Sequence, residues 1–372
     1  YLLARAGIDV VVLEKWPDFF RDFRGDTINP STMELLHELG LLEEFLKLPH
    51  NETKQVAANI SGQEIILADF TKLKTICPFL GFMPQWDFLN FLAQKGRHYD
   101  KFHLMMATEA CDLIQTNGKI TGLRAKNQNG EFEITAKLVV GADGRHSLVR
   151  EKSRLQRTDL GAPIDVLWFR LSRRDDHQAK SLGYVDRGQM MVLLDRDSYW
   201  QCAFIIRKGA AELIKQQGLE KFRQTIARTA PVLAPFVGEI TDWDQVKLLS
   251  VDVDHLETWY RPGLICIGDS AHAMSPVGGV GINLAVQDAV AAAEVLIPAF
   301  RRQAGISLQD LARIQARRAK AARRIQKIQV FIHKHILARV LADESPTKVP
   351  WQFKVISAVP FLRRIPAYLI GI

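Results

Sequence analysis

One stretch constrains the fold of this chain more than any other: LICIGDSAHAMSPVGGVGINLAVQDA, residues 264–289. Its pattern is typical of a short apolar strand that ends at Gly268 and Asp269, a glycine-rich loop, and a helix that begins near Ile282 and Asn283. Three glycines within four residues allow the backbone of this loop to approach a ligand closely. The helix start adds free N–H groups and a partial positive charge, which suit a phosphate or an electron-rich ring edge. We therefore favour a ligand-binding unit over a strand–loop–helix with a structural Asp cap.

The first residues have the pattern expected for the second half of a βαβ unit. YLLARAG is typical of the last turns of a helix that stops at Gly7, and IDVVVLEK is typical of a buried parallel strand that ends at Glu14. In a dinucleotide-binding fold, an acid at the end of the second strand accepts hydrogen bonds from the adenosine ribose. Taken alone, a glutamate at a strand end is usually a solvated surface residue.

A similar arrangement occurs in LVVGADGRHSLVR, residues 138–150. A strand again leads into a glycine-containing turn, which carries Asp143 and is followed by a helix start. Taken alone, this turn is more often structural than functional. It gains weight only because it occurs in the same chain as the two segments described above.

The rest of the chain differs in pattern. TNGKI and NQNGEF each carry Asn-Gly, the usual signal of a β-hairpin. Residues 161–250 alternate β-rich segments with turns and predict an antiparallel sheet with one helix near 211–228, whereas 307–340 predicts one long amphipathic helix. The predicted fold class is α/β: a Rossmann-like domain with a doubly wound parallel sheet, an inserted β-rich α+β domain and a C-terminal helical region. The predicted boundaries are 1–160 with 251–300 for the nucleotide-binding domain, 161–250 for the substrate domain and 301–372 for the helical region.

Charge and cysteine content exclude several classes of protein. The formal net charge is +8, but residues 301–340 hold eleven Lys/Arg against one acid, so the remainder of the chain is slightly acidic. This concentration of charge in one segment argues against a general nucleic-acid-binding surface. The four cysteines are scattered without CxxC or zinc spacing, so we expect no metal site and a reducing, cytoplasmic setting. We also expect no transmembrane helix, because no uninterrupted apolar run of about 18 residues occurs.

Together these segments resemble one family. Glu14 after VVVL, the Asp143–Gly144 turn, and Gly268–Asp269 followed by Pro276 and GGVGINLA are similar to the flavoprotein aromatic hydroxylases, the single-component FAD monooxygenases typified by p-hydroxybenzoate hydroxylase. RDFRGDTINPSTMELLHELGLL and MPQWDFLNFL also match, since these enzymes place arginines ahead of the first helix and a Gln at the start of the second. The resemblance covers roughly residues 1–300. Related halogenases and isoprenoid-chain reductases share parts of the motif.

The resemblance implies a nucleotide end of an FAD site. Glu14 binds the adenosine ribose, Arg24 lies near the pyrophosphate, and Gln85 contacts the ribityl-phosphate region. Asp143 belongs to the turn that serves both FAD and the nicotinamide donor. Asp269 binds the ribityl hydroxyls or the pyrophosphate.

The resemblance also implies a flavin end. Pro276 lines the reactive side of the flavin, and Gly279 belongs to the loop that approaches it. The backbone N–H groups of Gly281, Ile282 and Asn283 lie at the pyrimidine edge of the isoalloxazine, where the helix dipole stabilises negative charge on the reduced ring.

The reaction implied by the resemblance follows from the cofactor. NADH or NADPH reduces the flavin, O₂ adds to form a C4a-hydroperoxide, and a bound aromatic or other hydrophobic substrate takes the distal oxygen. The protein supplies position, polarity and exclusion of water. We therefore predict no catalytic side chain, and we interpret His146 and His272 as packing or hydrogen-bonding residues. The expected partners are a small hydrophobic molecule and O₂, and a homodimer is left open.

The chain departs from the family pattern at its start. GxGxxG occurs nowhere in it, and this turn normally lies about 20 residues before the ribose-binding acid. The strand before the turn is central in a doubly wound sheet, so its loss would leave two neighbours without partners. We therefore expect that the native polypeptide begins upstream of Tyr1 and has an intact mass above 42.0 kDa.

Two other functions remain open. The first is a flavin-free or non-catalytic binding protein that keeps the fold. Absorbance at about 450 nm, which only a flavin-containing protein shows, distinguishes it from a flavoenzyme. The second is a related flavin halogenase or reductase. The halogenase motif WxWxIP is absent, and its nearest counterpart, YWQCAFIIRKG, lacks the second Trp and the Pro.

Overall fold

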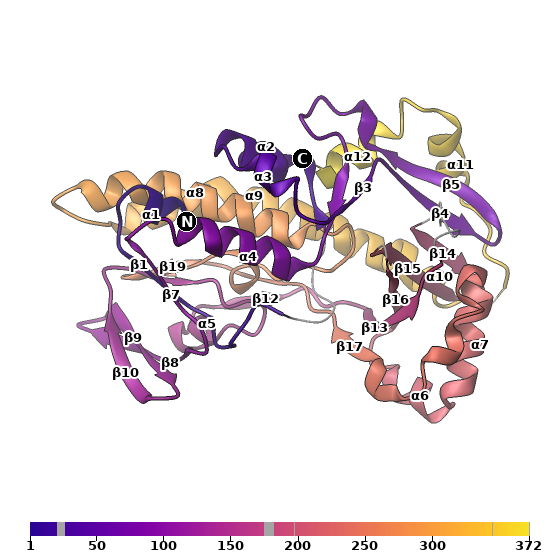
Figure 1. Ribbon diagram of the computed structural model, residues 1–372, viewed down its shortest axis with the longest axis horizontal. Helices are drawn as coiled ribbons and strands as arrows, with labels where there is room; N and C mark the ends of the chain where they lie inside the picture. The colour runs from indigo at the N-terminus through magenta and orange to yellow at the C-terminus, as the bar shows by residue number, and fades with distance from the viewer. Residues whose placement is uncertain (21–26, 175–181, 197, 344, 372) are drawn as a thin grey trace.

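The computed structural model describes residues 1–20, 27–174, 182–196, 198–343 and 345–371. The two longest helices of this part, α8 (Gly281–Arg301) and α9 (Leu308–Ile332), run side by side along the long axis of the molecule (Figure 1). Strands β8 to β10 lie toward one end of this axis, and helices α6 and α7 lie toward the other. The two long helices therefore extend from the end that holds β8 to β10 toward the β-rich part at the other end.

The predicted parallel sheet is present as two pieces. β1 (Val10–Leu13) pairs in parallel with β7 (Phe102–Met105). β11 (Val139–Gly141) pairs in parallel with β20 (Leu264–Cys266), and β19 (Tyr260–Arg261) runs antiparallel at the edge of β20. Within the described residues no strand pairing joins the two pieces. Glu14 follows β1 and Asp269 follows β20, so both predicted ligands lie at carboxyl ends of parallel strands, as expected for this fold.

A mixed sheet of seven strands forms the β-rich part. β4 pairs in parallel with β14, and the other neighbours are antiparallel. The strand order is β17 (Lys247–Ser250), β13 (Ile164–Ser172), β16 (Tyr199–Arg207), β15 (Gln189–Asp195), β14 (Gly183–Asp186), β4 (Gln55–Ile60) and β5 (Gln63–Asp69). The sheet therefore draws two strands from residues 55–69, outside the β-rich segment that the sequence indicates.

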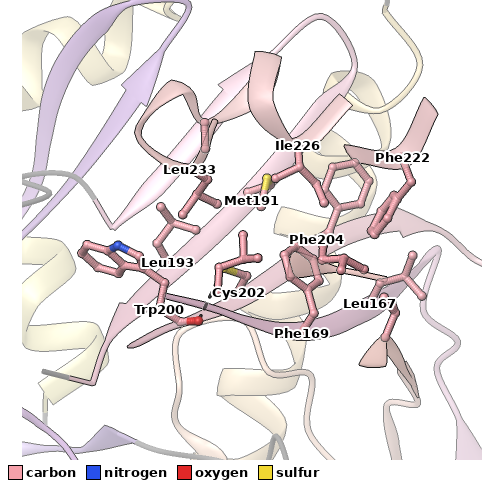
Figure 2. Packing of buried hydrophobic residues seen from close by; sticks show 14 of the residues in the cluster. Leu167, Phe169, Met191, Leu193, Trp200, Cys202, Phe204, Phe222, Ile226 and Leu233 are labelled. Carbon is pink, nitrogen blue, oxygen red and sulfur yellow. Dashed lines mark hydrogen bonds between the residues drawn. The ribbon is translucent and has the colours of Figure 1, made fainter. Parts of the chain in front are cut away.

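The two faces of this sheet have different partners, because successive side chains of a strand point to opposite sides. On one face, Leu167 and Phe169 of β13 pack with Phe204 of β16 against α7 (Leu219–Thr229), as Figure 2 shows for this buried cluster. On the other face, Val166 and Ala203 belong to a second cluster and line a cavity. One face therefore packs against α7, and the other packs in part against C-terminal residues such as Leu337 and Leu341 and in part lines the cavity.

The helix predicted near 211–228 is two helices. α6 (Ala211–Gln216) ends before Gly218, and α7 begins at Leu219. Gly218 has φ +91°, a conformation that interrupts a right-handed helix and that glycine adopts at little cost. The prediction of a single helix is therefore wrong at this residue.

The long basic helix is confirmed, with one addition. Ser307 caps α9 through a reciprocal capping box with Asp310, which fixes the start of the helix. After Ile332 the chain continues through a π-helical turn, His333–Leu337, into α10 (Ala338–Val340). A π turn inserts one extra residue into the helical repeat, and no signal in the sequence predicts it.

The remaining elements are short. Both predicted hairpins form; the first turns at Asn117–Gly118, whereas the second turns at Gln128–Asn129 and has Gly130 paired with Asn127. Pro84 rather than a side-chain cap precedes α4. The helices are α1 (Leu2–Arg5), α2 (Pro30–Glu38), α3 (Leu42–Phe45), α4 (Gln85–Gly96), α5 (Leu148–Ser153), α11 (Trp351–Ala358) and α12 (Arg364–Gly371). The strands are β2 (Thr27–Ile28), β3 (Asn51–Thr53), β6 (Leu80–Phe82), β8 (Glu109–Thr116), β9 (Lys119–Asn127), β10 (Gly130–Thr135), β12 (Arg157–Asp159) and β18 (Asp254–Leu256), and 3₁₀ turns occupy Phe70–Lys72, Pro231–Leu233, Val237–Glu239, Trp243–Gln245 and Gly268–Ser270.

Helix α8 is the one helix in the described part of the chain that is long and apolar enough to cross a membrane. Half of its most apolar stretch is buried inside the protein, and α8 packs against α1, α2 and α9. These contacts are those of a core helix, in which apolar side chains face protein on several sides.

Candidate cofactor and substrate site

The turn at Gly268 and Asp269 is anchored on both sides by hydrogen bonds. The Gly268 N–H donates to Asp288 Oδ2 at 3.0 Å, and the Ser270 hydroxyl donates to the Gly141 carbonyl at 2.6 Å. Gly268 has φ +61°, and a Cβ there would lie 3.0 Å from the Cβ of Ala285. This close approach of β20 to α8 requires glycine, and it fixes the direction in which Asp269 leaves the strand.

Asp288 is the buried centre of a charged network that the sequence analysis missed. Its Oδ2 lies 2.6 Å from His272 Nε2, and its Oδ1 accepts from Arg318 Nε at 2.8 Å. Burial acts to raise the pKa of Asp288, but the hydrogen bonds from His272, Arg318 and the Gly268 N–H outweigh it and hold the pKa below its ordinary value. In the sequence, the one feature that could have indicated this network is the single acidic residue in the alanine-rich segment NLAVQDAVAAA. His272 is thus a hydrogen-bonding residue, as predicted.

The glycine loop brings backbone close to the start of α8. Gly279 has φ +63°, and a Cβ there would lie 2.6 Å from Thr27 Oγ1. Gly281 is the first residue of α8, and a Cβ on it would stand 3.9 Å from Asp269 Oδ1, so this carboxylate lies beside the helix start. No side chain of the described residues caps α8 at Val280. The amides of its first turn therefore remain as donors, which suits the electron-rich edge of a flavin ring.

Asn283 locks the start of α8 to α2. Its Oδ1 accepts from the Asn29 N–H at 2.9 Å and from the Thr32 hydroxyl at 2.7 Å, and its Nδ2 donates to the Thr27 carbonyl at 3.0 Å. The side chain is buried and fully engaged within the protein. Only the backbone N–H of Asn283 is therefore left for the role that the family resemblance implies.

Asp143 organises the second turn. Its Oδ2 accepts from the Val149 N–H at 3.0 Å, and its Oδ1 accepts from the Ser147 hydroxyl, so the carboxylate holds the start of α5. Glu14 lies half-buried after β1, and its Oε1 accepts from the Trp16 N–H at 3.0 Å. Gln85 is the first residue of α4, half-buried after Pro84. These three side chains thus sit at the ends of elements, where backbone groups and water are accessible.

One cavity of about 3080 Å³ brings the predicted residues together. Glu14, Gln85, Asp143, Asp269, Pro276, Gly279, Gly281 and Ile282 all line it. Arg24 lies outside the described residues, and the side chain of Asn283 faces α2 instead. The edges of β1 and β11 also face this cavity, which is several times larger than a typical single-ligand site.

The same cavity continues along the face of the seven-stranded sheet that lies opposite α7. Its wall there is apolar and includes Val166, Met190, Val192, Ala203 and Ile205. No metal-binding cluster of His, Cys, Asp or Glu occurs among the residues that the structure describes. The space can therefore hold a dinucleotide against the turns and a hydrophobic molecule against the sheet.

Comparison with known proteins agrees with this arrangement. The sequence pattern of the family described as "FAD binding domain" matches residues 1–327. The 6-methylpretetramide 4-monooxygenase of Streptomyces rimosus is 29% identical over 99% of this chain and 86% of its own length, and the para-nitrophenol 4-monooxygenase of Pseudomonas sp. is 25% identical over 83% of this chain and 76% of its own length.

Solved structures show the same fold. The p-nitrophenol 4-monooxygenase of Pseudomonas putida superposes with a TM-score of 0.79 at 21% identity, covering 100% of this chain and 94% of that one. A ternary complex of aklavinone-11 hydroxylase with FAD and aklavinone gives a TM-score of 0.75 at 19% identity, covering 95% of this chain and 69% of that one. The chain belongs to the FAD binding domain family, and it is an FAD-dependent monooxygenase.

Proposed function

We propose that this enzyme uses FAD, NADH or NADPH, and O₂ to hydroxylate a large, hydrophobic aromatic substrate. One observation carries the proposal: the polar turns at Asp143 and Asp269 and the apolar face of the seven-stranded sheet line a single continuous cavity. Such a cavity lets a flavin ring, held at the turns, lie directly against a substrate ring, held on the sheet. Substrates of the relatives named above are aromatic, which supports the same class for this chain.

Each group of residues has one role in this proposal. When bound, FAD supplies the redox and oxygen chemistry. The first-turn amides of α8 bind the pyrimidine edge, and Asp269 accepts hydrogen bonds from the ribityl hydroxyls or lies beside the pyrophosphate. Glu14 accepts from the adenosine ribose, Gln85 contacts the ribityl-phosphate region, and Arg24 neutralises the pyrophosphate. The apolar wall excludes water and orients the substrate ring.

The apolar wall also indicates the size of the substrate. Val56, Ala58 and Leu67 of β4 and β5 extend the surface begun by β13 to β16. These six strands present mostly aliphatic side chains to the cavity, and small residues such as Ala58 and Ala203 leave room for fused rings. We therefore propose a polycyclic rather than a single-ring phenol as the preferred substrate.

Purified protein tests the proposal directly. We expect flavin absorbance at about 450 nm. We also expect NAD(P)H oxidation to be stimulated more strongly by polycyclic phenols than by single-ring phenols. Ala203→Trp, which fills the wall, should abolish stimulation by polycyclic compounds while flavin absorbance stays. Leu213→Trp, on an exposed position of α6, is the matched control and should behave as wild type. A colourless protein that takes up no FAD would support the flavin-free binding protein instead.

The cellular setting and oligomeric state are also proposals. The four cysteines are unpaired, which supports a reducing, cytoplasmic compartment. Trp351 and Phe361 are 69% and 66% exposed on the C-terminal segment, and burial of these side chains in a homodimer would remove them from water. Light scattering should then give twice the monomer mass, and the double variant Trp351→Glu with Phe361→Glu should give the monomer.

A further inference from the structure

The loop that carries Pro276 is held by one buried glutamine of α9. Gln329 is 3% exposed, and its Nε2 donates to the carbonyls of Ser275 and Val277 at 2.9 and 2.8 Å. Its Oε1 accepts from the Ser275 N–H at 3.1 Å. Because proline has no N–H, the backbone at Pro276 cannot donate a hydrogen bond of its own. Gln329 therefore fixes the loop on both sides of the one residue that lacks this donor.

His333 adds a second contact one turn later. Its Nε2 lies 2.8 Å from the Ser275 hydroxyl, and that hydroxyl accepts from the Val277 N–H at 3.2 Å. His333 is 1% exposed, and it begins the π-helical turn that interrupts the long helix. The irregular turn, which such helices often have at functional sites, thus coincides with a contact to the loop.

The same helix also forms part of the cavity wall. Ile328, Ile332 and Ile336 recur every four residues and line the cavity, as do Pro276 and Val277 of the loop. Gln329 and His333 recur at the same interval, one position further along. One helix surface therefore contacts both the proposed substrate space and the loop beside the proposed flavin space.

We propose that Gln329 and His333, which we call the α9 clamp, are positioning residues that hold the Ser275–Gly279 loop at the flavin and transmit substrate binding to it. This inference rests on the proposed function for its catalytic consequence, but not for its structural one. A substrate ring that presses on Ile328 and Ile332 acts on the helix that also fixes Pro276. Without the clamp, the loop would open and admit water, and the enzyme would then consume NAD(P)H without hydroxylating the substrate: NAD(P)H, one proton from solvent and O₂ would give NAD(P)⁺ and H₂O₂.

Helix α9 offers a matched control. Gln315 Oε1 accepts from the Trp259 N–H at 3.1 Å, and its Nε2 donates to the Glu257 carbonyl at 2.8 Å. It thus makes the same kind of side-chain contact with backbone from the same helix, but neither Glu257 nor Trp259 lines the cavity. A general loss of helix docking should appear in both Gln329→Leu and Gln315→Leu.

Hydrogen exchange of the FAD-free chain tests the structural part. The amides of Val277 and Gly279 donate to Ser275 Oγ and to the Pro276 carbonyl, so neither is bonded to Gln329 itself. In Gln329→Leu we expect both to exchange about tenfold faster or more, which reports opening of the whole loop rather than loss of one bond. Unchanged exchange at these two amides, or equal acceleration in Gln315→Leu, would overturn the inference.

The FAD-loaded enzyme tests the catalytic part. We expect Gln329→Leu and His333→Leu to raise the share of NAD(P)H consumption that ends as H₂O₂ and to alter the flavin absorption spectrum. His333→Gln keeps a polar group near the Nε2 position and should restore the coupling, which a purely structural defect would not show. If His333→Leu remains coupled, or if His333→Gln is as uncoupled as His333→Leu, the clamp has no positioning role. A chain that binds no FAD overturns the proposed function, yet leaves the exchange result valid.

Discussion

Replacing Asp288 with asparagine removes the charge at the centre of the buried network beside the Gly268–Asp269 turn. Asp288 has no exposed surface and accepts from three donors, namely His272 Nε2, Arg318 Nε and the Gly268 N–H, at 2.6 to 3.0 Å. Asparagine has one acceptor oxygen, so at least one of these buried donors loses its partner. The Arg318 guanidinium, whose side chain is 13% exposed, is then left without its counter-charge.

The expected cost follows from these contacts. Hydrogen bonds to charged groups contribute about 1.5–3 kcal/mol each, and removing one partner of a buried ion pair costs about 3–5 kcal/mol. We therefore expect Asp288→Asn to lower the free energy of unfolding by about 3–5 kcal/mol. In urea this corresponds to a fall in the unfolding midpoint of about 1 M or more.

A second buried aspartate provides the control. Asp310 accepts from the Ser307 N–H and hydroxyl and from Arg302, so its partners lie at the start of α9, whereas Asp288 accepts from the Gly268 N–H of the turn. Asp310→Asn should therefore also reduce stability, whereas only Asp288→Asn should speed amide exchange at Gly268 and weaken FAD retention. A urea midpoint for Asp288→Asn within about 0.2 M of wild type would refute the reasoning that this network holds the turn.

Three further predictions concern single residues. Gly278 and Gly279 have φ +85° and +63°. Gly278→Ala should lower the free energy of unfolding by about 1 kcal/mol through backbone strain alone, whereas Gly279→Ala should lower it further because the added Cβ would lie 2.6 Å from Thr27 Oγ1. Equal urea midpoints for the two variants would contradict the structure. Burial lowers the pKa of His333, so the stability contributed by its neutral form is complete above about pH 6.5 and is lost as the pH falls through the folded-state pKa. His333→Gln removes this titrating group, so the free energy of unfolding should decrease less between about pH 7 and 5 than in the wild type. An equal decrease in both proteins would show that His333 is not the source of the pH dependence. Burial, and to a smaller extent the Asp143 charge, raises the pKa of Cys266 to about 12, and burial also raises the pKa values of Cys77 and Cys202. A thiol reagent at about pH 8 should therefore label only Cys111 rapidly in the native protein and all four cysteines after unfolding. Rapid reaction of a second thiol in the native protein would contradict this burial.

Features that depend on adjacent residues could be predicted from the sequence. Glu14 follows its apolar strand directly, Asp269 comes shortly after the end of β20 at Cys266, and the structure has both at carboxyl ends of parallel strands. Asn117 and Gly118 have φ +49° and +80°, the conformations that an Asn-Gly hairpin requires. Ser307 caps the long helix that its surrounding pattern predicts. Each of these outcomes is set by a few consecutive residues and their local hydrogen bonds.

Features that depend on distant residues could not be predicted. Asp288 accepts a hydrogen bond from Arg318, which lies thirty residues away in the sequence, and Gln329 accepts one from Ser275, which lies fifty-four residues away. No sequence pattern around either pair predicts these contacts. β4 joins β14 in parallel although the two strands come from different parts of the chain. Pairing of this kind depends on which strand edges remain free after the rest has packed.

The amino-acid sequence was sufficient to predict the cofactor class of this protein, because three strand-end segments with an acidic residue, two of them glycine-containing turns, occur together in one chain, a combination typical of a dinucleotide site. It was sufficient for the family and for most of the residues that we propose to contact FAD. Only the tertiary structure decided where the hydrophobic wall lies and what holds Pro276 beside the cavity. Those features are made by side chains far apart in the chain, and burial against α8, α9 and the seven-stranded sheet selects them.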